Sequence, residues 1–220
     1  MIKKHGVNAN PLVFTDLFRL AGENVTCIVD AGAHSGSFTN TFKLKYPGAA
    51  IHAFEPIPYL ANSIRNMFGG PNVTVYSYAL GMYSAQNVRL GVTKKKGATS
   101  ILLPSSNLKK YHGNGVDIVE TFNVDVIALD SLKLPPLDIF KLDIQGSELI
   151  ALEGAVETLK TTRIILCEVQ FIPLYDNAPL MKDIWEMLNN MGFRLYNLYE
   201  LWSQQSDGQL TAGDAIFIKE

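Results

Sequence analysis

A glycine-rich turn that follows an apolar run constrains the fold of this chain more than any other feature. Residues 25–29 are apolar and partly β-branched, which predicts a strand buried on both faces. Asp30 follows this run, and Gly32 and Gly36 come next. Glycines at these positions allow a sharp turn and leave room for a ligand to approach the backbone. The pattern therefore predicts a strand, a binding turn and a helix.

A second apolar run, residues 50–54, ends in Glu55. A carboxylate at the end of that strand can accept both hydrogen bonds of a ribose diol. The dinucleotide fingerprint G-x-G-x-x-G has a glycine where this chain has Asp30, and an acid there would repel a pyrophosphate. The same acid suits a cationic sulfonium with an amino-acid tail. The turn thus favours S-adenosylmethionine over a dinucleotide, and Glu55 argues against a strand-turn-helix that binds nothing.

Apolar runs alternate with helical patterns along most of the chain, which predicts an α/β fold with a parallel sheet and helices on both faces. Strands are expected at 25–29, 50–54, 73–78, 138–143, 164–168, 193–198 and 215–219, and helices at 12–20, 58–67, 147–159 and 180–191. Runs at 86–92 and 116–129 predict an inserted, hairpin-like element. We therefore expect one domain over residues 1–220, with an N-terminal helical extension at 1–24 and an insertion at 84–128.

Composition narrows the class of protein. The chain has 220 residues and a formal net charge of −2, which gives no electrostatic case for nucleic acid as the main partner. No apolar stretch is long enough to span a membrane. Cys27 and Cys167 fall inside apolar runs, as expected for reduced, buried cysteines. These features predict a cytoplasmic enzyme.

Four acids follow apolar runs that predict neighbouring strands: Asp30, Glu55, Asp143 and Glu168. Ligands of open α/β sheets bind outside the carboxyl ends of the strands, where these acids would meet. Asp143 and Glu168 are therefore candidate catalytic residues. With Gln170 their oxygens would also suit Mg²⁺, which can lower the pKa of a hydroxyl acceptor. The alternative is that both carboxylates order loops or bind the cofactor.

Other candidates carry weaker signals. His112 lies in the insertion, where it is either a general base or an exposed loop residue. The run Lys94–Lys96 either meets an acidic substrate or is a solvated loop. Three aromatic residues flank late loops and are candidates for stacking on a sugar: Tyr175, Tyr199 and Trp202. Trp185 falls in an apolar helical pattern and is expected in the core.

Taken together, these motifs resemble the FkbM-type methyltransferases, class I enzymes that use S-adenosylmethionine. The resemblance rests on the motifs at 30–36, 54–56, 78–81, 141–148, 152–155 and 214–217. The most specific of them is the block Lys-x-Asp-x-Gln-Gly-x-Glu that begins at Lys141. The chain departs from the family at His34 and Tyr78, where the family often has Asn.

The resemblance implies a Rossmann-like, seven-stranded sheet with a reversed last strand, and methyl transfer to a hydroxyl of a sugar or other small molecule. The implied cofactor-binding residues are Asp30, Gly32, Ala33, His34, Gly36, Glu55, Pro56, Tyr78, Ala79, Leu80, Asp143 and Gln145. Methylation of nitrogen or of a macromolecule, and a non-catalytic subunit that binds the cofactor, stay open as alternatives. The acceptor and the oligomeric state are not specified by the sequence.

Overall fold

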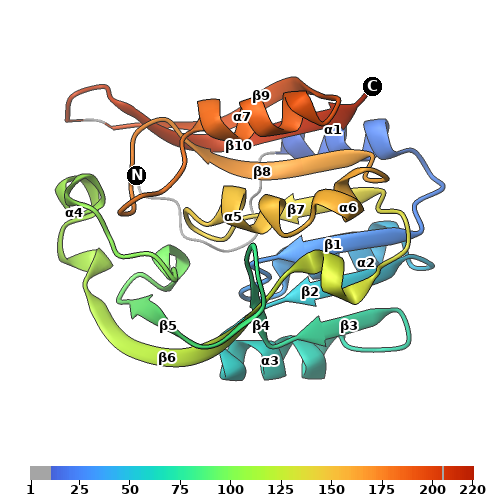
Figure 1. The fold of residues 1–220 in the computed structure, drawn as a ribbon, viewed down its shortest axis with the longest axis horizontal. Helices are drawn as coiled ribbons and strands as arrows, with labels where there is room; N and C mark the ends of the chain where they lie inside the picture. The colour runs from blue at the N-terminus through green and yellow to red at the C-terminus, as the bar shows by residue number, and fades with distance from the viewer. Residues whose placement is uncertain (1–10, 205) are drawn as a thin grey trace.

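A seven-stranded sheet in the order β3-β2-β1-β7-β8-β10-β9 forms the centre of the computed structural model, which describes residues 11–204 and 206–220 (Figure 1). Its strands are β1 (Cys27–Ala31), β2 (Ala50–Phe54), β3 (Val73–Tyr76), β7 (Ile139–Leu142), β8 (Ile164–Gln170), β9 (Phe193–Ser203) and β10 (Leu210–Lys219). Strands β3, β2, β1, β7 and β8 are parallel to one another, whereas β10 is antiparallel to both β8 and β9. The predicted seven-stranded sheet with a reversed last strand is confirmed.

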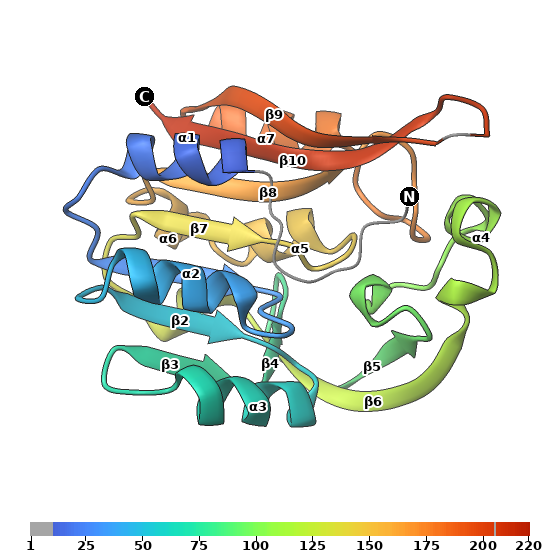
Figure 2. The same cartoon turned by 180° about the vertical axis from the view of Figure 1, so that it is seen from behind.

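Helices cover both faces of this sheet. The helices are α1 (Pro11–Ala21), α2 (Ser37–Lys45), α3 (Pro58–Phe68), α5 (Glu148–Glu153), α6 (Val156–Leu159) and α7 (Met181–Asn190). Figure 1 shows α5, α6 and α7 in front of the sheet, and the reverse view in Figure 2 shows α1, α2 and α3. Leu17 and Phe42 belong to the core on one face, and Leu159 and Ile184 belong to the core on the other. Of the extension predicted at 1–24, residues 1–10 lie outside the described residues.

The insertion forms a second, three-stranded sheet. β5 (Ala85–Thr93) and β6 (Ile118–Ile127) are antiparallel, as the predicted hairpin requires. A third strand, β4 (Tyr78–Leu80), pairs parallel to β6. The run 73–78 is therefore not one strand but breaks at Ser77. A short helix, α4 (Ser106–His112), and the 3₁₀ turns η1 (Lys96–Ala98) and η2 (Gly113–Val116) complete the insertion and were not predicted.

The helix expected at 147–159 is interrupted at Gly154, where the backbone passes very close to the turn after β4. A Cβ on Gly154 would lie 2.0 Å from the Gly81 carbonyl oxygen. The chain then begins again as α6, whose first turn is capped by Asp130 in the 3₁₀ turn η3 (Leu129–Leu132). The Asp130 carboxylate accepts hydrogen bonds from the backbone N–H groups of Glu157 and Thr158. The interruption thus lets the insertion pack against the main sheet.

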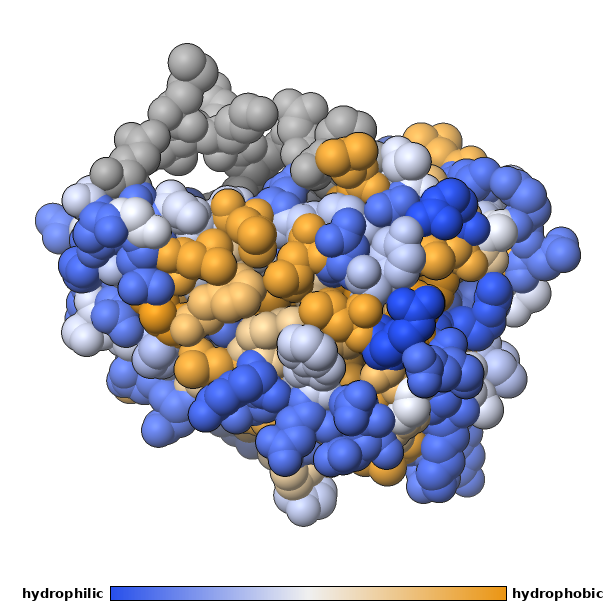
Figure 3. All heavy atoms as spheres, turned by 90° about the horizontal axis from the view of Figure 1, so that it is seen from above, coloured by the Kyte–Doolittle hydropathy of each residue, from blue (hydrophilic) through white to orange (hydrophobic). Residues whose placement is uncertain are grey.

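Apolar side chains gather on the outer face seen from above the β9 edge (Figure 3). Leu201 and Trp202 of β9 are 48% and 40% exposed, and Trp185 of α7 is 45% exposed, so its prediction as a core residue is wrong. In the part of the chain that the structure describes, no helix is long and apolar enough to cross a membrane. Both cysteines are buried free thiols, as expected.

We expect Gly154→Ala to destabilise the fold by about 1–3 kcal/mol, because the new methyl group would collide with backbone that cannot rotate away. A thermal unfolding curve should show a lower Tm. Gly48→Ala is the matched control, since a Cβ at Gly48 would meet nothing within 4 Å. Equal Tm values for the two variants would contradict the proposed close packing of the insertion.

Candidate functional site

The turn between β1 and α2 is held in a conformation that side chains disfavour. Gly32, His34 and Gly36 have φ angles of 75°, 48° and 80°. A Cβ on Gly32 would lie 1.9 Å from the Asp143 carbonyl oxygen, so the turn passes directly against the end of β7. The N–H groups of Gly32 and Ala33 both donate to the Phe54 carbonyl at 3.0 Å. These contacts fix the turn at the carboxyl ends of β1, β2 and β7.

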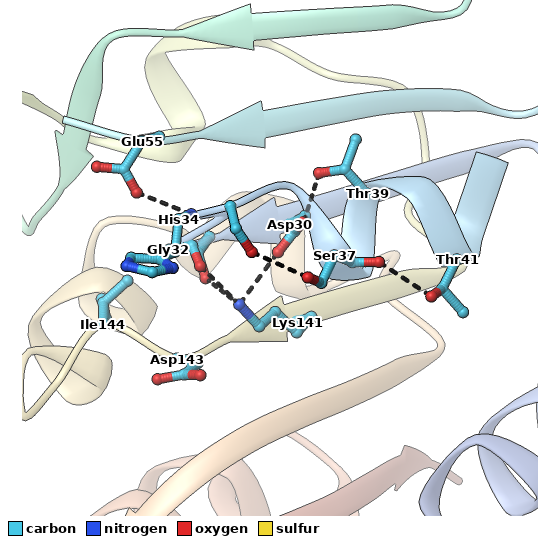
Figure 4. Close-up of polar contacts among 12 residues, drawn as sticks. Asp30, Gly32, His34, Ser37, Thr39, Thr41, Glu55, Lys141, Asp143 and Ile144 are labelled. Atoms are coloured by element: carbon cyan, nitrogen blue, oxygen red, sulfur yellow. Dashed lines mark hydrogen bonds and ion pairs between the residues drawn. The ribbon is translucent and has the colours of Figure 1, made fainter. Parts of the chain in front are cut away.

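A buried ion pair lies beneath this turn (Figure 4). Asp30 and Lys141 are 0% and 2% exposed, and their Oδ1 and Nζ atoms are 3.1 Å apart. The Lys141 ammonium also donates to the carbonyls of Ala31 and Gly32, each at 2.9 Å. The other oxygen of Asp30 accepts a hydrogen bond from the Thr39 hydroxyl at 2.6 Å. Asp30 thus supports the turn from below.

The charge of Lys141 is maintained by the acids around it. Burial acts to lower the pKa of this lysine, but Asp30, Asp143 and Asp214 outweigh burial and leave the pKa raised. A buried ammonium is tolerated only where it is paired and hydrogen-bonded, and this one satisfies both conditions.

Glu55 lies next to the turn at the carboxyl end of β2 and is 4% exposed. Its two oxygens accept one backbone hydrogen bond each, from His34 at 2.8 Å and from Ile57 at 2.9 Å. Burial raises the pKa of Glu55 to about 7. Each carboxylate oxygen has a second lone pair, so both can still accept a hydrogen bond from a ligand.

The loop after β7 is folded around Glu148, the last residue of the Lys-x-Asp-x-Gln-Gly-x-Glu block. The Glu148 carboxylate accepts hydrogen bonds from the N–H groups of Ile144 and Gly146. It is 2% exposed, and burial raises its pKa. This acid therefore shapes the loop that presents Asp143 and Gln145.

Gln145 bridges the two candidate catalytic carboxylates. Its Nε2 amide nitrogen donates to Asp143 at 2.7 Å and to Glu168 at 2.9 Å. Its Oε1 oxygen accepts a hydrogen bond from the Tyr175 hydroxyl at 2.8 Å. Burial, together with the charges of Asp143, Glu148 and Asp214, raises the pKa of Glu168 well above its usual range. The raised pKa favours the protonated form of Glu168 beside the Gln145 amide.

The magnesium site expected at Asp143, Glu168 and Gln170 finds no support. The amide nitrogen of Gln145 lies between the two carboxylates, where a cation would have to sit. The Oε1 oxygen of Gln170 accepts the Leu174 N–H at 2.9 Å, and its Nε2 atom is a buried donor without a partner in the described structure. Over residues 11–204 and 206–220, no group of three or more His, Cys, Asp or Glu side chains is placed to hold a metal ion.

The remaining residues that the sequence singled out do not join Asp143 and Glu168 in the roles predicted for them. His112 lies at the end of α4, and no described contact joins it to Asp143 or Glu168. Tyr175 is 1% exposed, so it cannot stack on a sugar as expected. The segment 78–80 enters the second sheet, with Tyr78 37% exposed and Leu80 buried. Pro56 follows Glu55 and is partly exposed.

Three participants were missed by sequence reasoning. Thr39 was passed over because a threonine inside a helical pattern carries no signal of its own. Asp214 lies on the reversed strand, where register places it opposite Glu168. Glu148 is part of the specific motif, and its position two residues after Gly146 was the signal that could have identified it as the loop's anchor.

Comparison with known proteins agrees with this geometry. Residues 30–195 match the model of the methyltransferase FkbM domain, which is more than half of the chain. The chain belongs to the FkbM methyltransferase family. This membership supports the prediction of S-adenosylmethionine as the cofactor. The chain is 28% identical over 174 residues to the 2-O-methyltransferase NoeI of Sinorhizobium fredii (strain NBRC 101917 / NGR234), covering 73% of this chain and 70% of that protein.

Solved structures share the fold of this member of the FkbM family. A methyltransferase FkbM from Methylobacillus flagellatus KT has a TM-score of 0.52 at 15% identity, and the match covers 88% of this chain but only 43% of that longer chain. A precorrin-6y C5,15-methyltransferase from Geobacter metallireducens GS-15 has a TM-score of 0.53 at 12% identity, covering 99% and 93%. At such identities the likeness establishes a class I methyltransferase fold and leaves the acceptor open.

We expect the free energy of unfolding to fall as the pH rises from about 5 to 8. Burial raises the pKa of Glu55, Glu148 and Asp214 to about 7, and it raises the pKa of Glu168 well above its usual range. The unfolded chain releases these protons near pH 4.5, so each group contributes stability that is lost by up to about 1.4 kcal/mol per pH unit in that window. His52, whose pKa burial lowers, opposes this trend.

Urea denaturation at pH 5, 6, 7 and 8 measures the effect, and Asp214→Asn should flatten the curve. A stability that increases over this range would show that the acids at the edge are ionised in the folded protein.

Proposed function

We propose that the protein transfers the methyl group of S-adenosylmethionine to a hydroxyl group of a sugar or another small hydroxylated molecule. The observation that carries the proposal is the position of Asp143: its backbone carbonyl lies against the glycine turn, and among the described residues its carboxylate accepts a hydrogen bond from Gln145 on one oxygen only. The likeness to a 2-O-methyltransferase supports oxygen as the methylated atom. The small net charge of −2 also favours a small-molecule acceptor over nucleic acid.

The residues of the turn fit a nucleoside cofactor with a charged tail. Gly32 and Gly36 let the turn pack against the Asp143 carbonyl and the Phe68 ring, where a side chain would collide, and Ala33 and His34 complete the turn. Glu55 is buried, ionisable near pH 7 and able to accept two more hydrogen bonds, as a ribose diol requires. Segment 78–80 and Pro56 would line the adenine side, and Asp143 and Gln145 the floor. When bound, S-adenosylmethionine supplies a methyl group on a sulfonium leaving group.

Of the candidate catalytic residues, Asp143 is the one suited to take the proton of the acceptor hydroxyl. Its Oδ2 oxygen accepts no hydrogen bond from the described residues, so it can face a substrate. Burial raises the pKa of Glu168 well above its usual range, which favours its protonated form and a role as a neighbouring hydrogen-bond donor. A base in hydrogen-bond reach contributes about 10²–10⁴-fold to such a step.

We expect Glu55→Ala to weaken the binding of S-adenosylhomocysteine by at least about tenfold, because a hydrogen bond to a charged group is worth about 1.5–3 kcal/mol. Isothermal calorimetry at pH 8 measures the affinity. Glu157→Ala is the control, since Glu157 is an exposed acid on α6 that pairs only with Lys160 among the described side chains. Equal affinities in both variants would move the ribose site elsewhere.

Turnover tests the acceptor class. We expect some members of a panel of methyl glycosides to be methylated on oxygen, with release of S-adenosylhomocysteine, and Asp143→Asn to lower kcat by about 10²-fold or more. The affinity of this variant for S-adenosylhomocysteine is measured alongside, because Asp143 also lies in the proposed floor of the cofactor site. Mass spectrometry and NMR of the product identify the methylated atom. Methylation of amines or RNA in place of glycosides would overturn the proposed acceptor class.

A further inference from the structure

Tyr175 is a buried tyrosine outside every motif that the fold or the cofactor explains. It lies in the loop between β8 and α7 and is 1% exposed. Its hydroxyl is 2.8 Å from Oε1 of Gln145 and 3.2 Å from the Ala98 carbonyl oxygen. Burial raises its pKa well above the usual range, so the hydroxyl keeps its proton and remains a donor. The side chain is therefore aimed at the residue that bridges the two candidate catalytic carboxylates.

The ring of Tyr175 packs against the backbone of Gly146, which has no side chain. A Cβ on Gly146 would lie 3.0 Å from the Tyr175 ring, and the φ angle of 97° already favours glycine at this position. Tyr175 thus fills the space beside Gly146, the glycine of the Lys-x-Asp-x-Gln-Gly-x-Glu block. This requirement gives that glycine a role besides turning the chain.

The insertion holds Tyr175 from the other side. Ser105 donates from its backbone to the Leu174 carbonyl at 3.0 Å, and the Asp176 N–H donates to the Leu103 carbonyl at 2.8 Å. Another part of the insertion, Ser100, donates its hydroxyl to the Gln145 carbonyl at 2.7 Å. The insertion therefore fixes both the backbone of Gln145 and the loop that carries Tyr175.

We propose that Tyr175 is a positioning residue for methyl transfer, which anchors the Gln145 amide so that its N–H groups stay on Asp143 and Glu168. The proposal rests on the proposed function. With Oε1 held by Tyr175, Gln145 occupies one oxygen of Asp143 and leaves the other open to the acceptor. The acceptor oxygen then forms a bond to the methyl carbon as the carbon–sulfur bond breaks, the electron pair goes to sulfur, and the hydroxyl proton goes to Asp143.

Without the Tyr175 hydroxyl, the Gln145 side chain loses its fixed end and Asp143 is free to rotate away from the acceptor. We expect Tyr175→Phe to lower kcat about tenfold with a methyl glycoside as the probe, while the affinity for S-adenosylhomocysteine changes less than about twofold. Tyr199→Phe is the matched control, because Tyr199 is also buried and its hydroxyl donates to Asp16. Asp16 belongs to α1, which lies on the opposite face of the sheet from α5. The Tyr199→Phe variant should lose about as much stability as Tyr175→Phe but keep the kcat of the wild type.

A double-mutant cycle separates positioning from general destabilisation. If Tyr175 acts through Gln145, then Tyr175→Phe should have no further effect on kcat in a Gln145→Met background. Additive losses, or a kcat for Tyr175→Phe equal to that of the wild type, would overturn the proposal.

A second readout does not need turnover. The Gln145 side-chain amide gives a ¹H–¹⁵N signal that is identified by its absence in Gln145→Met. We expect its protons to exchange slowly with D₂O in the wild type and at least about tenfold faster in Tyr175→Phe, but not in Tyr199→Phe. Unchanged exchange in Tyr175→Phe would overturn the positioning role. Failure of the proposed function would appear separately, as absence of methyl transfer by the wild-type protein.

Discussion

The contacts of one buried ammonium group hold the site together. Lys141 reaches from β7 to the end of β1, where it pairs with Asp30 and binds the carbonyls of Ala31 and Gly32. Its Nζ atom also lies 4.9 Å from the centre of the Phe38 ring. Removing either charge would leave the other buried without a partner, which is far more costly than the pair itself. The glycine turn, the start of α2 and the end of β7 therefore take their relative positions from this group.

Two close backbone approaches then bring the functional acids to one edge. Gly32 passes against the carbonyl of Asp143, and Gly154 passes against that of Gly81. The first joins the turn to the loop that carries Asp143, and the second brings the insertion to the same side of the sheet. Burial and the neighbouring acids raise the pKa of Glu168, which favours its protonated form at this edge of the sheet.

Much of the fold could be predicted because buried parallel strands carry continuous apolar runs and end in recognisable acids. The break at Ser77 could not be predicted, because β3 and β4 are separated only by the pairing of β4 with β6 in the second sheet. The convergence of Asp143 and Glu168 could be predicted, because both residues end neighbouring parallel strands. The prediction of a magnesium ion between them failed, because a sequence does not show that the Gln145 amide lies between the two carboxylates. Tyr175 lies in a loop without periodicity, 30 residues from its partner Gln145.

A crystal structure of the protein with S-adenosylhomocysteine would show whether the cofactor occupies this edge of the sheet. We expect the ribose hydroxyls to lie within hydrogen-bond distance of Glu55, and the amino-acid tail to lie over the turn from Gly32 to Gly36. We also expect the sulfur to face the open oxygen of Asp143. A complex in which the nucleoside occupies another edge of the sheet, or in which the sulfur lies far from Asp143, would contradict the account.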